Sequence, residues 1–253
     1  MKLSSKLLIA MLSSLMLTVL SVAHAQDAVV VDGDDDTDDV TEISDRRTLG
    51  PQELMIEGTE KVLDMITNNR DKWEADPEYR KQQIDALFLP SMDFRAMSKL
   101  VLGGNWRQMN KAQRERFVEG FKSLLVRTYA KSLSQYSDEE IRYLPFRPGR
   151  DPEKRAMVRS EIIRASGPAI PVNYRLRYKP QDGWKIYDLD IEGISLVANY
   201  RTSMRRNIAS KGIEKVLTSL EERASAGDDE LDDDLDGGFQ EEIKKKAQAK
   251  EAA

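Results

Sequence analysis

The sequence predicts an α+β domain in which helices pack on a curved, mainly antiparallel four-stranded sheet. From about residue 51 to residue 136, apolar residues recur every three or four positions, which is the period of amphipathic helices. After Ser137 the period changes to two, which is typical of half-buried strands. The helical period returns from Val197 onward. Helices, then a meander, then helices again form the order of an α+β domain.

Prolines mark the bounds of the first two predicted helices. The first follows Gly50-Pro51 and ends near Asn68-Asn69. The second has Asp76 as N-cap and Pro77 at its first position, and Pro90 ends it because proline lacks the N–H that continues a helix. Their apolar faces carry Met55, Val62, Leu63, Ile66, Ile84, Leu87 and Phe88.

The longest predicted helix begins at Asn110. A shorter helix, from Asp93 to Leu100 or Leu102, precedes it. The Asn110 side chain can cap the long helix while Gln113 reaches back, as in a capping box. Its broad apolar face carries Phe117, Phe121, Leu124, Leu125, Tyr129, Leu133 and Tyr136.

Four strands are predicted at residues 141–146, 157–165, 171–179 and 184–191, because turn residues separate these runs. Alternation assigns Val172, Tyr174, Leu176, Tyr178, Tyr187, Leu189 and Ile191 to an apolar face. It assigns Asn173, Arg175, Arg177, Lys179, Asp188 and Asp190 to the opposite face. Asp188 and Asp190 could form a catalytic carboxylate pair, but on this face we expect solvated surface. The sheet therefore has one apolar and one charged face.

Two helices complete the domain, with Val197, Tyr200, Met204 and Ile208 on the first and Ile213, Val216, Leu217 and Leu220 on the second. The folded domain is predicted at residues 49–226. About 180 residues suit one domain that buries roughly 70% of its unfolded surface. The sequence has no internal repeat.

Residues 1–25 have the features of a secretory signal peptide. Lys2 and Lys6 form a positive n-region, residues 7–20 are apolar, and Ala23-His24-Ala25 is a small-x-small cleavage site. The apolar run is shorter than the roughly 20 residues that a membrane-spanning helix needs. We predict cleavage after Ala25 and export of the mature chain.

The mature chain would contain neither histidine nor cysteine, because the one histidine of the sequence is His24 and cysteine is absent. Catalysis by Ser-His-Asp or Cys-His groups is therefore excluded, as are a zinc site, disulfides and a lipid anchor on an N-terminal cysteine. These absences favour a protein that works by binding. Carboxylates, tyrosines and lysines could still support an enzyme.

Acidic segments flank the predicted domain. Residues 26–48 hold a run of aspartates that cannot bury enough surface to fold, and we expect disorder there. Residues 227–253 form an acidic, charged tail of low complexity whose Lys/Ala/Glu-rich end could be helical but has little to pack on. Asp232-x-Asp234-x-Asp236-Gly237 matches the opening of a calcium loop, but its twelfth position is Ile243, so we predict no metal site.

The region between the acidic segments is basic. Residues 46–227 contain 33 Lys+Arg against 25 Asp+Glu, a net charge of +8 that the overall value of −5 conceals. The arginine-rich stretches are either a solvated face or a docking surface for acidic partners and anionic headgroups. The acidic tails are expected to screen this surface. Nucleic acid is not an expected partner of an exported protein.

Several motifs resemble one family. Asp190-Ile-Glu-Gly-Ile-Ser-Leu-Val-Ala-Asn-Tyr-Arg201 follows Trp184-Lys-Ile-Tyr187, and Leu102-Gly103, Trp106-Arg107 and Gln113-x-x-x-Phe117-x-x-x-Phe121 precede it. In this order they resemble the MlaC or toluene-tolerance family of periplasmic phospholipid-binding proteins, over roughly residues 50 to 225. Gly104-Asn105 and Met204 depart from the family pattern, which usually has a bulkier pair and a phenylalanine at these places.

The resemblance implies an NTF2-like cone with an apolar cavity that holds phospholipid acyl chains. It implies a monomeric periplasmic shuttle between an outer-membrane lipoprotein and porin complex and an inner-membrane ABC transporter, with transient membrane contact and no enzymatic activity. Phospholipid is the cargo, and no cofactor is expected. The physical need is clear, since a phospholipid has about thirty methylenes, and exposing them to water costs roughly 20 to 25 kcal/mol.

The candidate lipid-binding residues are Met97, Val101, Leu102, Trp106, Phe117, Phe121, Leu125, Tyr129, Ile162, Val172, Tyr174, Leu176, Tyr187, Leu189, Val197, Tyr200 and Met204. Tyrosine suits a cavity mouth, because its ring packs on acyl chains while its hydroxyl meets the headgroup. Three alternatives stay open. The same residues could fill a solid core, Trp106 and Arg201 could be structural, and the chain could be an exported enzyme acting on a small hydrophobic substrate.

Overall fold

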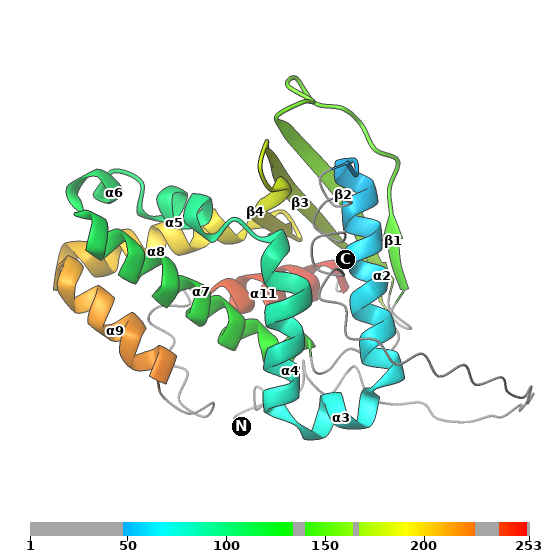
Figure 1. Cartoon of the computed structure of the whole chain (residues 1–253), viewed down its shortest axis with the longest axis horizontal. Helices are drawn as coiled ribbons and strands as arrows, with labels where there is room; N and C mark the ends of the chain where they lie inside the picture. Colours follow the sequence, from blue (N-terminus) through cyan, green and yellow to red (C-terminus); the bar gives the residue numbers. More distant parts are fainter. Residues whose placement is uncertain (1–47, 134–139, 164–166, 226–237, 252–253) are drawn as a thin grey trace, which may run out of the picture.

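Most helices lie at one end of the molecule, and an antiparallel sheet with the first helix alongside it forms the other end (Figure 1). The computed structural model describes residues 48–133, 140–163, 167–225 and 238–251. The helices are α2 (Pro51–Asn68), α3 (Arg70–Ala75), α4 (Pro77–Gln83), α5 (Phe94–Leu102), α6 (Asn105–Gln108), α7 (Lys111–Leu133), α8 (Leu196–Lys211), α9 (Ile213–Ser225) and α11 (Phe239–Glu251). A π-helical turn η2 (Ile84–Phe88) and a 3-10 turn η3 (Leu89–Ser91) extend α4.

The sheet has five strands in the order β1-β2-β3-β4-β5, each antiparallel to its neighbour. They are β1 (Glu140–Tyr143), β2 (Arg155–Ile163), β3 (Ile170–Lys179), β4 (Gly183–Ile191) and β5 (Ile194–Ser195). The α+β class and the antiparallel sheet are confirmed, but the strand count of four was wrong. The fifth strand has two residues, which is too short for alternation to reveal.

Local capping chemistry places the helices where the sequence predicted them. The Asp76 side chain accepts hydrogen bonds from the backbone N–H groups of Glu78 and Tyr79, both at 3.0 Å. Asn110 and Gln113 bond each other's backbone N–H reciprocally at 2.9 Å, which confirms the capping box. Helices α3 and α6 were not predicted, because six and four residues carry too little periodic pattern.

Helix α9 packs closely against α7. A Cβ added to Gly120 of α7 would lie 2.8 Å from the Leu220 Cβ of α9, so this contact requires glycine. Beside it, Arg116 donates to Glu214 and Glu221, at 2.8 Å and 2.6 Å. The hydrogen bond from Arg116 lowers the pKa of the Glu221 carboxyl. The pKa of the Glu214 carboxyl is lowered most by the hydrogen bond from Gln113 and next by the bond from Arg116.

Asp188 joins the sheet to α8. The prediction that Asp188 lies on solvated surface was wrong, since its residue exposure is 3%. Its carboxylate accepts hydrogen bonds from the Ser195 hydroxyl at 2.7 Å and the Val197 backbone N–H at 3.0 Å, and it pairs with Arg175 at 2.9 Å. Asp188 therefore extends the N-terminal cap of α8, while Asp190 on the same face stays half-buried.

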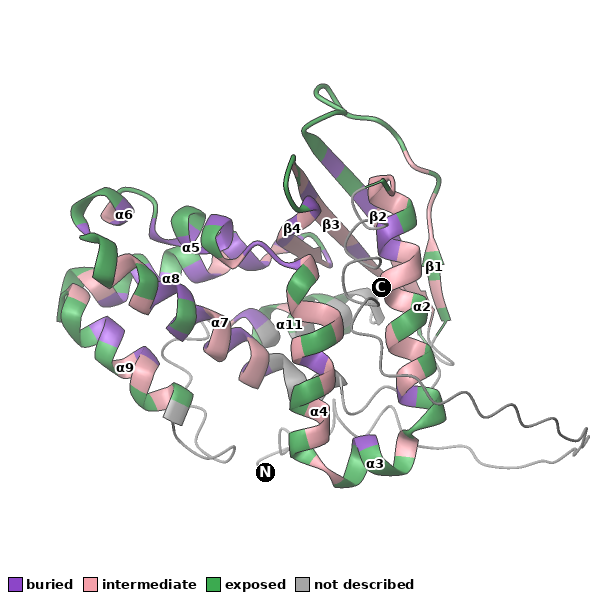
Figure 2. Cartoon of the chain, viewed as in Figure 1, coloured by how far each residue is buried: buried purple, intermediate pink, exposed green. Residues whose placement is uncertain are grey.

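The buried residues gather where α5, α7 and α8 meet one another and the sheet (Figure 2). A second, smaller cluster joins α2, α3 and η2 through Ile66, Trp73 and Ile84. The C-terminal helix α11 also reaches the main cluster through Phe239, which has 0% exposure. The prediction that this end of the chain has little to pack on was therefore wrong. Residues 232–237, which resemble the opening of a calcium loop, and the acidic run 26–45 lie outside the described residues.

Candidate functional site

The apolar face of the sheet is sealed at one end and half-exposed at the other. At the sealed end, cross-strand neighbours Ala156, Leu176 and Ile186 are all buried. Met92 of the loop after η3 forms a parallel bridge to Ile186, and α5 and α8 cover the same end. We call the other end the half-exposed apolar surface, and its residues are Tyr143, Ile162, Ile170, Tyr174, Leu189 and Ile191.

Strand register brings the half-exposed apolar surface together from four strands. Tyr174 of β3 lies opposite Leu189 of β4, and Ile162 of β2 lies opposite Ile170 of β3. Side chains that face each other across an antiparallel pair lie within contact distance. A bulge between Arg175 and Leu176 leaves Tyr187 without a cross-strand partner in the register. The surface is thus continuous across β2, β3 and β4.

Tyr174 lies deep in the molecule and is still accessible. Its side chain is of intermediate exposure on the central strand, yet burial raises the pKa of its phenol, and a hydrogen bond with Ser160 opposes that shift. Ser160 itself is buried and donates to the Val172 carbonyl oxygen at 3.3 Å. The accessible phenol beside a buried hydroxyl gives the centre of this apolar surface a polar patch.

Helix α2 borders the surface on the side of β1. The Tyr143 hydroxyl donates to the Met55 carbonyl oxygen at 2.9 Å and contacts the Thr59 hydroxyl at 2.6 Å. Burial raises the pKa of the Tyr143 phenol. Since Met55 and Leu54 belong to the main core, these bonds hold α2 across the edge of the sheet.

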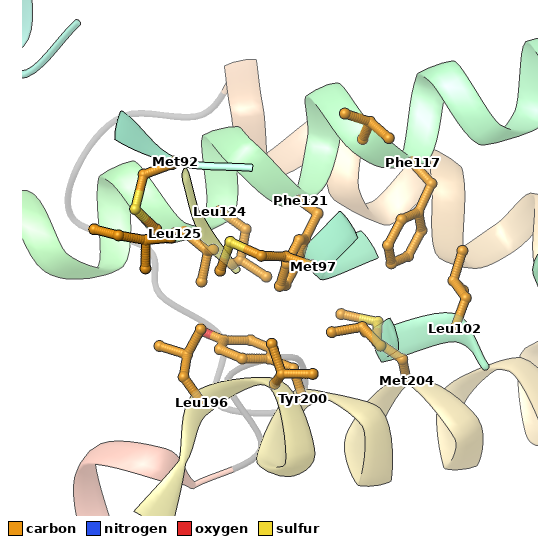
Figure 3. Close-up of a cluster of buried hydrophobic side chains, with 14 of the residues drawn as sticks. Met92, Met97, Leu102, Phe117, Phe121, Leu124, Leu125, Leu196, Tyr200 and Met204 are labelled. Carbon is orange, nitrogen blue, oxygen red and sulfur yellow. The ribbon is translucent and has the colours of Figure 1, made fainter. Parts of the chain in front are cut away.

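The helical half of the interior is tightly packed. Figure 3 shows the labelled side chains of α7 pointing toward Tyr200 and Met204 of α8. The rings of Phe117 and Phe121 stack with centroids 5.7 Å apart, and Phe121 meets Tyr200 edge to face at 5.2 Å. Phe121, Tyr200 and Met204 have 0% exposure, so they are out of contact with solvent.

The predicted lipid-binding residues fall into three groups. The sealed helical interior contains Met97, Val101, Leu102, Trp106, Phe117, Phe121, Leu125, Val197, Tyr200 and Met204. The sheet contributes the buried Val172 and Leu176 and the half-exposed Ile162, Tyr174, Tyr187 and Leu189. Tyr129 belongs to α7, but its side chain lies outside the described residues. Whether each contacts lipid stays a prediction.

Four residues that the structure places on the half-exposed apolar surface or in the core cluster beside it were absent from that prediction: Tyr143, Ile170, Ile191 and Phe239. Tyr143 and Ile170 sit near strand ends, where the pairing register decides the face and a single strand carries little pattern. Ile191 shows the same alternation as Leu189, which could have revealed it. Phe239 is an isolated aromatic residue four positions before Ile243 in a charged segment, and this helical spacing was the available signal.

Trp106 and Arg201 have structural surroundings. The guanidinium groups of Arg95 and Arg114 lie over the Trp106 ring, 5.6 Å and 5.4 Å from its centroid. Arg114 also donates to the Trp106 carbonyl oxygen at 2.9 Å. Arg201 donates to the Leu100 carbonyl oxygen at 2.7 Å and so ties α8 to the end of α5. These contacts support the structural alternative for both residues.

The opposite face of the sheet is charged and internally paired. Asp93, with 3% exposure, accepts from the Ala96 backbone N–H at 3.0 Å and pairs with Arg177 and, at 3.2 Å, Lys179. Arg175 similarly pairs with Asp188 and Asp190. Much of the positive charge predicted for docking is therefore used to attach α5 and α8 to the sheet.

Two further features bear on function, both limited to the residues that the structure describes. Among them, no group of His, Cys, Asp and Glu side chains is arranged to hold a metal ion. None of the described helices combines the length and apolarity needed to cross a membrane.

Comparison with known proteins decides the family. The family model described as MlaC protein matches residues 57–222. The chain belongs to the MlaC family. The match spans every described element from α3 to α8 and most of α2 and α9, and it leaves α11 outside.

Individual MlaC-like relatives agree with this assignment. The intermembrane phospholipid transport system binding protein MlaC of Haemophilus influenzae is 27% identical over 177 residues, covering 69% of this chain and 82% of the relative. The toluene tolerance protein Ttg2D of Pseudomonas putida is 25% identical over 162 residues, covering 62% and 74%.

One solved structure extends the likeness to three dimensions. It is a phospholipid-binding protein from Ralstonia solanacearum in complex with a phospholipid, and it is 29% identical to this chain. The TM-score is 0.64, and the likeness covers 70% of this chain and 98% of that one.

Proposed function

We propose that this protein is an exported, periplasmic phospholipid-binding shuttle that holds acyl chains against the half-exposed apolar surface. One observation carries the proposal: apolar side chains of four strands stay accessible on the inner face of a sheet that is covered farther along, at Ala156, Leu176 and Ile186. Leaving such residues unburied forgoes roughly 25 cal/mol for each Å² of apolar surface. A ligand with an apolar surface would recover that free energy.

The chemistry of the surface suits a phospholipid. Tyr174, Leu189 and Ile162 offer apolar contact to acyl chains, and the Tyr174 hydroxyl offers one hydrogen bond. A charged headgroup must stay near water, because burying it without partners is costly. The relative that was solved with a phospholipid supports this assignment.

The expected partners are an inner-membrane ABC transporter complex and an outer-membrane lipoprotein and porin complex. Support for this part of the proposal comes from the name of the Haemophilus relative, which places it in an intermembrane transport system. Transfer between an apolar site and a bilayer changes little apolar exposure, so docking can decide its direction. A monomer and a periplasmic location belong to the same proposal.

Native mass spectrometry of the purified full chain tests lipid binding directly. Copurified phospholipid is the expected result, and it should leave when Leu189→Arg places a charge on the half-exposed apolar surface. Met157→Arg is the matched control, because Met157 lies on the opposite face of β2 with 43% exposure. This control should keep both fold and lipid.

Three results would contradict the proposal. Full lipid occupancy in Leu189→Arg would mean that lipid does not bind at the half-exposed apolar surface. A wild-type chain that is purified without lipid and takes up no phospholipid from vesicles would support the alternative of a solid core. A small hydrophobic substrate in place of lipid would favour the alternative of an exported enzyme.

A further inference from the structure

The C-terminal helix α11 inserts an aromatic residue into the main core although it lies outside the family match at residues 57–222. Phe239, its first residue, has 0% exposure and belongs to the core cluster that also contacts Tyr174, Leu189 and Ile191. Ile243, one helical turn later, is partly buried against the same cluster. Among the described side chains, these two form the apolar stripe of a helix rich in lysine and glutamate.

Helix α11 lies against α8 and β5, as its red ribbon beneath α8 illustrates (Figure 1). Near its middle, the Lys246 ammonium donates to the Glu192 carbonyl oxygen at 3.2 Å. Glu192 belongs to the turn between β4 and β5 and has a left-handed φ of 56°. The helix thus sits at the β4–β5 edge of the sheet, on the opposite side from α2.

This position makes α11 a neighbour of the half-exposed apolar surface. Ile191 at the end of that surface pairs with Ile194 of β5, and β5 contacts α11. The surface is therefore bordered by α2 along β1 and by α11 along β5.

The attachment of α11 is slight compared with that of α7, α8 and α9. Glu241, Glu242, Lys245 and Lys246 are exposed, so among the side chains of α11 that the structure describes, only Phe239 and Ile243 contribute apolar burial. A helix of 13 residues is also marginally stable by itself in water, and its docking supports its own structure. Undocking α11 would uncover Phe239 and leave the core of residues 57–222 otherwise intact.

We propose, on the basis of the proposed function, that α11 is an intramolecular competitor of the lipid cargo. In the lipid-free chain Phe239 occupies apolar space beside the half-exposed surface, and an acyl chain that enters this space displaces α11. The benzyl side chain and an acyl chain satisfy the same apolar surface, but one position cannot hold both. The apparent lipid affinity then falls in proportion to the fraction of molecules with α11 undocked.

The test uses the full chain, freed of lipid, and vesicles of phosphatidylethanolamine and phosphatidylglycerol. Phe239→Ser removes the apolar anchor and should raise the apparent affinity for vesicle lipid by about tenfold if one molecule in ten is undocked in the wild type. Gln248→Ser, an exposed change on the same helix, is the control and should match the wild type.

Hydrogen exchange of the wild-type chain gives a second readout that needs no substitution in the core. The amides of α11 should be protected in the lipid-free chain and exchange faster after loading, while those of α7 stay protected. Equal or weaker lipid binding by Phe239→Ser, or α11 protection that loading leaves unchanged or increases, would overturn the competition. A failure of every variant to bind lipid would instead refute the proposed function, and this inference with it.

Discussion

The two halves of the interior are both apolar, but they differ in how completely their side chains are packed. Between α5, α7 and α8, residues such as Phe121 and Tyr200 are in full contact and have 0% exposure. On the far half of the sheet, Tyr174 and Leu189 face inward and remain accessible. The comparison teaches that hydrophobicity and orientation do not distinguish a stabilising core from a binding surface. The completeness of packing does, because only incompletely covered apolar groups have free energy left for a ligand.

The largest expected effect separates the two halves by stability. Phe121→Ala should lower the free energy of unfolding by about 3–5 kcal/mol, because it opens a cavity in a sealed core. Leu189→Ala should lower it by about 1 kcal/mol or less, since part of that side chain is already exposed. Urea denaturation of both lipid-free variants measures the difference. Equal losses would mean that the sheet half is as tightly packed as the helical half.

A second variant tests the attachment between the two halves. Asp188→Ala removes the acceptor for Ser195, Val197 and Arg175 and should cost about 2–3 kcal/mol, because buried charged hydrogen bonds are lost together. Asp190→Ala, on the same strand and face but less buried, is the matched control and should cost less than 1 kcal/mol, in line with the roughly 0–1 kcal/mol of a surface ion pair. Thermal denaturation is the measurement. A small effect at Asp188 would show that its burial is incidental to holding α8.

A third variant overfills the helical half instead of emptying it. Gly120→Ala places a methyl group 2.8 Å from the Leu220 Cβ and should cost about 1–3 kcal/mol as α9 shifts from α7. Gly58→Ala in α2, where nothing lies within 4 Å of the added Cβ, should be neutral or stabilising by up to about 1 kcal/mol. Opposite changes in unfolding midpoint are expected. If both glycines tolerate alanine, the α7–α9 contact is looser than described.

The smallest effect concerns pH and the surface of the helical half. The pKa values of Glu214 and Glu221 are lowered in the folded state from 4.5, by hydrogen bonds from Gln113 and Arg116 at Glu214 and from Arg116 at Glu221. Groups with a depressed folded pKa stabilise the protein above their unfolded value, and this contribution disappears as pH falls through the folded pKa. The midpoint of thermal unfolding should therefore drop below pH 4.5 less steeply in Arg116→Met than in the wild type. Identical pH profiles would show that these ion pairs do not contribute to the stability of the α7–α9 contact.

Local signals in the sequence account for most of the secondary structure. Asp76, Asn110 and Gln113 act on backbone groups two or three residues away, so their capping roles could be predicted without tertiary contacts. The alternation from Val172 to Leu176 likewise predicted the apolar face of β3. Asp188 was misjudged for the converse reason. Alternation correctly assigned it to the polar face, but its burial depends on the start of α8, whose Ser195 and Val197 bond to its carboxylate.

By itself, the sequence determined the α+β class, the helix bounds set by caps and prolines, the inward faces and the motifs of the MlaC family, because each depends on neighbouring residues or on a short period. Only the tertiary structure decided which inward residues are sealed and which stay accessible, and that Phe239 of a charged tail enters the core. Burial is a property of what another segment covers. A residue's own spacing carries no record of how closely a distant helix approaches it.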